Sequence, residues 1–179
     1  MKEKVDDCLT WASCKEHDLV YLKSKLLPVN IRLLTKSSDY SALIRSACEL
    51  IIKRLKTDYC DYKKPHGMSG ANCAVPFNII AFFLNRSKDN KKIILMINPK
   101  ILQYLKETEI TDSNCGSIRL KNTIKVRRYK EVKVCWYDLN GKKYIQIFNR
   151  SNGSFTIQHE VDHNNGVLIT DRNLELTSR

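Results

Sequence analysis

The stretch FTIQHEVDHNNGVLI, residues 155–169, sets two histidines four positions apart and a glutamate directly after the first of them. Residues four apart lie on one face of an α-helix, so His159 and His163 can offer ring nitrogens to one metal ion. Glu160 is then well placed to take a proton from a water molecule held by that ion. The pattern favours a catalytic metal site, with a surface helix that carries two unrelated histidines as the alternative.

The same stretch contains signals for the two ends of a helix. Ser154 is a candidate N-cap and Gly166 a candidate stop, which predicts a helix over residues 155–164. Asp162 lies three residues after His159, on the same side of that helix. We expect the Asp162 carboxylate to orient one of the metal ligands through a hydrogen bond.

The third ligand decides which class of metal enzyme the helix belongs to. Proteases of the metzincin class continue the pattern to H-E-x-x-H-x-x-G-x-x-H, but Ile169 stands where their third histidine would be. His17 and His66 stand in no recognisable motif, and Glu175 lies in a tail too short to form the separate helix that usually supplies a glutamate ligand. Cys115, in the segment DSNCGSI between two predicted strands, is the better candidate, because a thiolate is a strong metal ligand.

Length and composition are those of an ordinary globular protein. The 179 residues, with 42% hydrophobic and 28% charged, suit one domain with a sizeable core. The longest apolar run, IIAFFL at 79–84, is too short to span a membrane, and the N-terminus lacks the apolar segment of a secretory signal. The seven cysteines include no C-x-x-C pair, which favours reduced thiols. We therefore expect a cytoplasmic protein that does not contact membranes.

The net charge of +12 points to an acidic partner. Much of it lies in RLKNTIKVRRYKEVKV, residues 119–134, and such patches favour phosphate-rich surfaces such as RNA or the ribosome. The alternative is a solvated sheet face with no partner. No RNA-binding motif accompanies the charge, so the charge alone identifies no function.

The hydrophobic pattern predicts strands and two helices that do not alternate as strand-helix-strand. A helix begins near Ser38 or Asp39, either of which is a plausible N-cap, and residues 1–37 show no regular pattern. The predicted strands are FNIIAFFLNR at 77–86, KKIILMINPK at 91–100, and a hairpin around DLNG within 125–149. This arrangement indicates an α+β fold.

Three motifs in order give the chain a resemblance to the peptide deformylases, whose motifs are G-x-G-x-A-A-P-Q, E-G-C-L-S and H-E-x-D-H. The corresponding segments are GANCAVPF at 70–77, SNCGS at 113–117 and HEVDHNNG at 159–166. The resemblance runs from about residue 28 to 172 and implies antiparallel β-sheets packed around a central helix that carries the third motif. We expect one domain over residues 1–179, with residues 1–27 as an N-terminal extension.

The resemblance also implies a site and a reaction. By position, Cys115, His159 and His163 would bind one divalent metal, Fe²⁺ in the family, with Zn²⁺, Ni²⁺ or Co²⁺ able to occupy the same site. Glu160 would act as general base and acid in removing the formyl group from N-formylmethionyl peptides. A role in N-terminal processing during translation follows, in a monomer that meets the ribosome through its basic hairpin.

Several positions depart from the family pattern. Phe77 replaces the glutamine whose amide supports the developing oxyanion, and Asn78 beside it would point to the opposite face of a regular strand. The backbone N–H of Gly116 would be the other oxyanion donor. The residues implied to contact substrate are Gly70, Ala71, Asn72, Asn114, Arg128 and Phe155. Asn72 stands where the family has its second glycine.

These departures leave other hypotheses open. The chain is either a divergent deformylase or a deformylase-like metal-binding protein that has lost or changed this activity, with another N-acyl peptide as substrate or a binding role. A zinc protease is weakened by the missing downstream ligand. A nucleic-acid-binding module is supported by charge alone, and a steep loss of RNA binding with salt would distinguish it.

Overall fold

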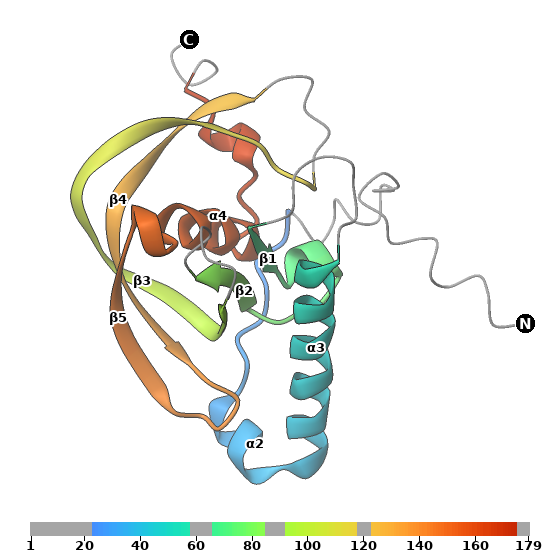
Figure 1. Ribbon diagram of the computed structural model, residues 1–179. Helices are drawn as coiled ribbons and strands as arrows, with labels where there is room; N and C mark the ends of the chain where they lie inside the picture. Colours follow the sequence, from blue (N-terminus) through green and yellow to red (C-terminus); the bar gives the residue numbers. More distant parts are fainter. Residues whose placement is uncertain (1–22, 58–65, 85–91, 118–122, 175–179) are drawn as a thin grey trace, which may run out of the picture.

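The described strands form one antiparallel sheet in the order β1-β2-β3-β4-β5 (Figure 1). The computed structural model describes residues 23–57, 66–84, 92–117 and 123–174. The strands are β1 Gly67–Ser69, β2 Ile79–Leu84, β3 Lys92–Ser113, β4 Ile124–Tyr137 and β5 Lys143–Asn149. The helices are α2 Ile31–Lys36, α3 Ser38–Lys56 and α4 Ser154–Asn164, with short 3₁₀ turns η3 Ala71–Cys73, η4 Arg150–Asn152 and η5 Ile169–Arg172. The expected α+β class is confirmed, and the described strands form one continuous sheet where we expected more than one.

Strand β2 is buried on both of its faces, which explains why the run IIAFFL shows no alternation of apolar and polar residues. Ile79 and Ala81 belong to a core cluster that includes the buried side of α3. Ile80 and Phe82 point to the other face and pack in a second cluster with Ile157 of α4. Successive residues of a strand point to opposite faces, so β2 needs apolar side chains at every position between two helices.

The long strands β3 and β4 bend around α4 (Figure 1). Their pairing is interrupted by register shifts between Ile97 and Lys100, and again between Leu105 and Thr108. Extra residues of this kind form β-bulges, which bend a strand and increase its twist. The predicted strand ended at residue 100, whereas β3 continues to Ser113 because the bulges preserve pairing but break the alternation. The result is a curved sheet that partly encloses α4.

Residues just before position 28 belong to the packed structure. Lys25 forms a bridge with Asn165 at the end of α4, and Leu27 forms a parallel bridge with Phe77. Leu26 between them is buried at 6% exposure. The extension that we placed at residues 1–27 therefore contributes backbone pairing to the domain, while residues 1–22 lie outside the described part of the chain.

The helix ends differ from the expected ones. Residues 31–36 form α2, where we expected no regular structure; Asn30 caps it by accepting from the N–H of Leu33. Ser37, not Ser38 or Asp39, caps α3 through its side chain. Helix α2 was not predicted because it has too few residues to show a helical period.

Helix α4 occupies the predicted residues, but a different residue caps it. Gly153, with a φ of +115°, precedes the helix, and Ser154 is its first residue. The Ser154 hydroxyl donates to the carbonyl of Lys130 in β4 at 3.0 Å. Ser154 thus ties the start of α4 to the sheet, and Gly166, with a φ of +74°, follows the helix as predicted.

Candidate metal centre

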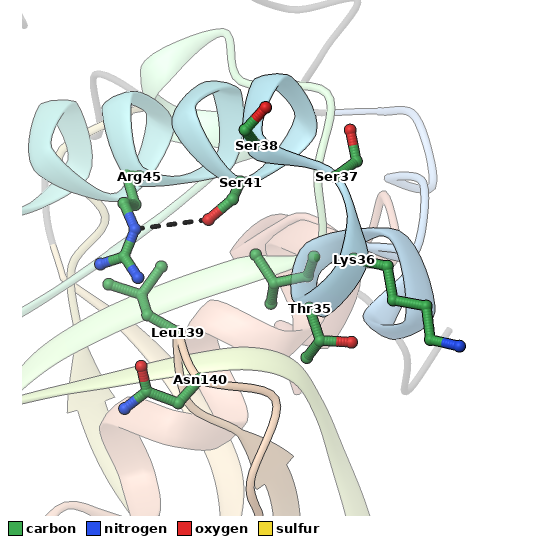
Figure 2. A pocket seen from close by; sticks show the side chains of 9 residues that line it. Thr35, Lys36, Ser37, Ser38, Ser41, Arg45, Leu139 and Asn140 are labelled. Carbon is green, nitrogen blue, oxygen red and sulfur yellow. Dashed lines mark hydrogen bonds between the residues drawn. The ribbon is translucent and has the colours of Figure 1, made fainter.

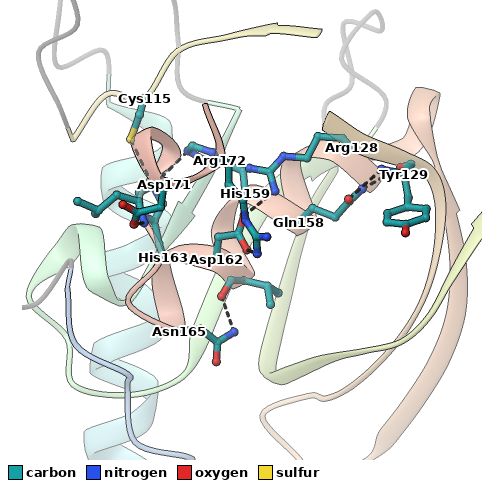
Figure 3. A network of polar contacts seen from close by, with 12 residues as sticks. Cys115, Arg128, Tyr129, Gln158, His159, Asp162, His163, Asn165, Asp171 and Arg172 are labelled. Carbon is teal, nitrogen blue, oxygen red and sulfur yellow. Dashed lines mark hydrogen bonds and ion pairs between the residues drawn. The ribbon is translucent and has the colours of Figure 1, made fainter. Parts of the chain in front are cut away.

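Three potential ligand atoms meet beside α4. Among the described residues, Cys115, His159 and His163 form a group whose ligand atoms all lie within 4.8 Å of one another (Figure 3). The Cys115 Sγ lies 3.3 Å from Nε2 of His163, and the two histidine Nε2 atoms lie 3.1 Å apart. The expected ligand set is therefore brought together, from the segment that follows β3 and from one face of α4.

The spacing of these atoms fits a tetrahedral metal site. Tetrahedral bonds of typical length place two nitrogen ligands roughly 3.3 Å apart and a nitrogen and a sulfur about 3.6 Å apart. The observed separations, 3.1 Å and 3.3 Å, fall within a few tenths of an ångström of these values. Three protein ligands leave one position of a tetrahedron open, which is the arrangement of catalytic sites.

The electrostatics of the site suit metal binding. Burial lowers the pKa of His163 to about 4, the nearby charge of Asp162 opposes this, and Arg128 adds to it. Burial likewise lowers the pKa of His159 well below its usual value, with smaller contributions from His163 and Arg128. Both rings are thus neutral near neutral pH, and the neutral imidazole is the form that binds a metal.

Glu160 lies inside the protein next to this cluster. It is 4% exposed, and its Oε2 atom is buried without a hydrogen-bond partner among the described residues. Burial raises the pKa of its carboxyl to about 8, and the charge of Arg128 offsets part of the rise. A Cβ atom at Gly67 would lie 2.7 Å from Oε1 of Glu160, so β1 packs tightly against the carboxylate. The site therefore holds a buried carboxyl that can exchange a proton near neutral pH.

The Asp162 carboxylate binds two arginines (Figure 3). Arg128 of β4 donates to Oδ2, and Arg172 of η5 donates to Oδ1 at 2.9 Å. Our expectation that Asp162 orients a metal ligand was wrong, because its two carboxylate oxygens bind arginines instead. The local sequence does not reveal these arginines, because they come from distant segments. Arg128 itself is 5% exposed, so it does not belong to a solvated face of the basic segment 119–134. Its Nη2 atom is buried without a hydrogen-bond partner in the described part of the chain.

The chain turns sharply at the position of the missing glutamine. Phe77 packs its ring edge against Tyr40 of α3, with the ring centroids 6.3 Å apart. The Ile79 N–H donates to the Phe77 carbonyl at 2.8 Å, which closes a tight turn at Asn78. The Asn78 side chain accepts from Asn164 of α4 at 2.8 Å. The strand is therefore irregular at Asn78, and its amide points toward the metal-bearing helix.

The remaining expected substrate residues lie in three places. Gly70 and Ala71 are buried in the turn before β2, and Asn114 and Gly116 are exposed on either side of Cys115. Phe155 is half-buried at the start of α4, where the Arg150 guanidinium lies 5.5 Å from its ring centroid. Asn72 donates to the Ser117 hydroxyl and thus joins the first two motifs, a contact that neither motif indicates by itself.

The structure has an open cavity elsewhere, with a volume of about 420 Å³ (Figure 2). It lies between the α2–α3 junction and the β4–β5 turn, and Arg45, Lys36 and Asn140 are among its lining residues. None of the residues that line it belongs to the Cys-His-His cluster. We therefore do not connect this cavity with the metal centre.

Some basic residues on β4 and just after β5 form ion pairs with glutamates of β3. Lys130 lies 2.7 Å from Glu107 of β3, and Arg150 after β5 lies 2.6 Å from Glu109. Lys125 and Arg127 remain exposed on β4. Within the described ranges, no helix is both long enough and apolar enough to cross a membrane.

Comparisons with known proteins agree on one family. The profile of polypeptide deformylases matches residues 24–179. A peptide deformylase of Thermotoga petrophila is 35% identical over 79 residues, which are 44% of this chain and 47% of that protein. A peptide deformylase of Finegoldia magna is 36% identical over 90 residues, 50% of this chain and 54% of that protein. The chain thus spans about half the length of the curated relatives that it matches.

Solved structures share the fold over most of the chain. The peptide deformylase of Thermotoga maritima has a TM-score of 0.67 at 22% identity, covering 86% of this chain and 90% of its own. A class I type b peptide deformylase of Acinetobacter baumannii, bound to Met-Ala-Ser, has a TM-score of 0.64 at 22% identity, covering 88% and 94%.

Proposed function

Since the chain belongs to the polypeptide deformylase family, we propose that it removes the formyl group from the N-terminal methionine of nascent polypeptides. The observation that carries this proposal is the Cys115, His159 and His163 cluster with the buried Glu160 beside it. We assign the three cluster residues as ligands of one divalent ion, Fe²⁺ by family resemblance. When bound, such an ion lowers the pKa of a water molecule and polarises a carbonyl oxygen.

Glu160 moves the proton in the proposed reaction. Its unpartnered Oε2 atom accepts a proton from the water that attacks the formyl carbon. The carbon–nitrogen bond then breaks, Glu160 delivers the same proton to the leaving amine nitrogen, and formate is released. A carboxyl whose pKa is about 8 can both take up and return a proton near neutral pH, which supports this double role.

The oxyanion that develops on the formyl oxygen needs donors other than the missing glutamine. Gly116 follows the cysteine ligand and offers its backbone N–H, as the family resemblance implies. Arg128 has a buried and unpartnered Nη2 atom within electrostatic reach of both histidines, and we propose that it supports substrate binding. Gly70, Ala71, Asn72, Asn114 and Phe155 remain proposed substrate contacts.

A second candidate function follows from Phe77. Its ring packs on Tyr40 and can donate no hydrogen bond, and the loss of one oxyanion donor typically lowers a rate about 10²–10³-fold. A deformylase-like protein that acts on another N-acyl peptide, or that only binds one, is therefore the alternative.

Formate release from formyl-Met-Ala-Ser tests the proposal. The protein is purified without oxygen, loaded with Fe²⁺ and assayed beside Glu160→Ala, which removes the proton carrier. We expect turnover by the native protein and a loss of at least about 10²-fold in the variant. A native protein that binds one metal ion per chain and releases no formate would reject deformylation in favour of the second candidate.

The cellular location, the oligomeric state and the contact with the ribosome also belong to the proposal. We propose a cytoplasmic monomer in one domain that meets the ribosome through the exposed basic residues of β4, among them Lys125 and Arg127. Binding of this kind weakens as salt increases, because the added ions screen the phosphate charges. Binding to ribosomes that is unchanged by salt would contradict this assignment.

A further inference from the structure

The side chain of Asn72 joins two segments that are far apart in the sequence. Its Oδ1 atom accepts from the backbone N–H of Ser69 at 2.8 Å and from the Ser69 hydroxyl at 2.5 Å. Its Nδ2 atom donates to the hydroxyl of Ser117 at 2.5 Å. One amide thus uses both its acceptor and its donor to connect β1 with the turn that contains Cys115. We refer to Ser69, Asn72 and Ser117 as the amide bridge.

The amide bridge lies inside the protein. Ser69 is 0% exposed, Ser117 is 6% exposed, and Asn72 is half-buried. Hydrogen bonds that are shielded from water have a defined geometry, and the loss of one partner leaves the other group desolvated and unpaired. The bridge is therefore a fixed connection, in contrast to a surface contact that water replaces at little cost.

Each end of the amide bridge lies beside a part of the metal centre. Ser117 is two residues after Cys115, in the same turn, and Cys115 is itself buried at 7% exposure. Ser69 ends β1, the strand whose Gly67 packs against Glu160. The bridge thus fixes the cysteine-bearing turn against the strand that also backs the proposed general base.

We propose that Asn72 is a positioning residue of the metal centre, which sets the place of the Cys115 thiolate relative to the two histidines. This inference rests on the proposed function insofar as Cys115, His159 and His163 are the metal ligands. Asn72 bonds to Ser69 and Ser117, and it acts on the Cys115 ligand through Ser117. Groups that hold a ligand in place typically change metal affinity about 10- to 100-fold when they are removed.

Metal affinity measures this role without any enzymatic assay. The apo forms of the native protein, Asn72→Ala, Ser117→Ala and the double variant are titrated with Co²⁺ in competition with a chelator. The thiolate-to-cobalt absorption band reports the bond to Cys115. We expect each single variant to weaken Co²⁺ binding about 10- to 100-fold and to shift this band. The double variant should bind no more weakly than the weaker single variant, because both substitutions break the same bridge.

Two further variants separate positioning from a general loss of stability. Ser117→Thr keeps the hydroxyl group and should retain near-native Co²⁺ affinity. Asn30→Ala removes an amide that caps α2 at 3.1 Å from the Leu33 nitrogen, away from the bridge. Asn30→Ala should lower the midpoint of thermal unfolding and leave the Co²⁺ affinity unchanged.

Native affinity and an unchanged cobalt band in Asn72→Ala would overturn the inference. So would single-variant effects that simply add in the double variant, or an equal loss of affinity in Asn30→Ala. A native protein that binds no Co²⁺ would overturn the ligand assignment itself. Bridge-dependent Co²⁺ binding without formate release would reject only the proposed reaction and would support the positioning role.

Discussion

At the scale of single residues, the absence of a side chain at Gly67 leaves space for the proposed general base. An added Cβ would lie 2.7 Å from Oε1 of Glu160 and 2.5 Å from Cγ2 of Thr156, both closer than real contacts allow. We expect Gly67→Ala to displace the Glu160 carboxylate. Displacements of about 1 Å can cost about 10²-fold in rate, so kcat for formate release should fall by that order while Co²⁺ affinity is retained.

Gly141→Ala is the matched control for this substitution. Gly141 has a φ of +75°, and an added Cβ would lie 2.6 Å from Thr35, a residue of α2 that is not part of the metal centre. The variant should be less stable than the native protein and keep its kcat. Equal loss of kcat in both glycine variants would show that the Gly67 effect is not specific to Glu160.

The sequence predicts the residues of the site better than their partners. The four-residue spacing places His159 and His163 on one face, and the family resemblance adds Cys115, so the cluster itself was foreseen. The arginines around Asp162 and the contact between Asn72 and Ser117 were not foreseen, because they join segments that only the folded chain brings together. Hydrogen bonds between distant segments leave no periodic signal in the sequence.

At the scale of elements, Asn98 fastens the segment before α2 to strand β3. Its side chain accepts from the N–H of Val29 and donates to the Val29 carbonyl, both at 2.8 Å. Asn98 also has a φ of +51°, a conformation that alanine adopts poorly. We expect Asn98→Ala to lower the free energy of unfolding by about 2–4 kcal/mol, because two partly buried hydrogen bonds are lost and alanine is strained at this positive φ.

Asn98→Gly separates these two contributions. Glycine tolerates the positive φ but has no side-chain amide. The free energy of unfolding of Asn98→Gly should therefore be about 1 kcal/mol higher than that of Asn98→Ala. Urea unfolding of the three proteins measures the difference. An alanine variant as stable as the native protein would show that Asn98 does not fasten the N-terminal segment.

Element types were more predictable than element lengths. The alternation of residues 125–149 gave the β4–β5 hairpin, and the histidine helix occupies the residues expected for it. The strand predicted for residues 91–100 ended too early, because the bulges of β3 break the two-residue period that identifies a strand. The burial of β2 on both faces could not be read from its sequence, since a short apolar run is also compatible with a buried helix.

At the scale of the whole molecule, Cys48 makes the stability of the fold decrease at alkaline pH. Cys48 is 1% exposed on the buried face of α3, and burial raises its thiol pKa from 9.0 to about 12. The neutral thiol therefore contributes its full stabilisation below about pH 9, where the unfolded chain begins to ionise. That stabilisation is lost as the pH rises from about 9 toward about 12.

Urea unfolding at several pH values tests this dependence. Between pH 9.0 and a pH one unit higher, the free energy of unfolding should fall more steeply for the native protein than for Cys48→Ala. The cavity left by alanine lowers stability at every pH, so the comparison uses the slopes and not the absolute values. Identical slopes would show that the Cys48 thiol does not ionise differently in the two states.

The pairing of Lys25 with Asn165 has a consequence for the order in which this protein is made. The two residues lie near opposite ends of the described chain, and Asn165 directly follows α4. Contacts that join such distant positions form slowly, because the intervening chain must first lose much of its freedom. During synthesis, Lys25 can pair with Asn165 only after the chain has been made through α4, whereas Leu27 can pair with Phe77 much earlier. A truncated copy that ends before α4 therefore lacks both this pairing and the histidines, so incomplete chains carry no assembled metal centre.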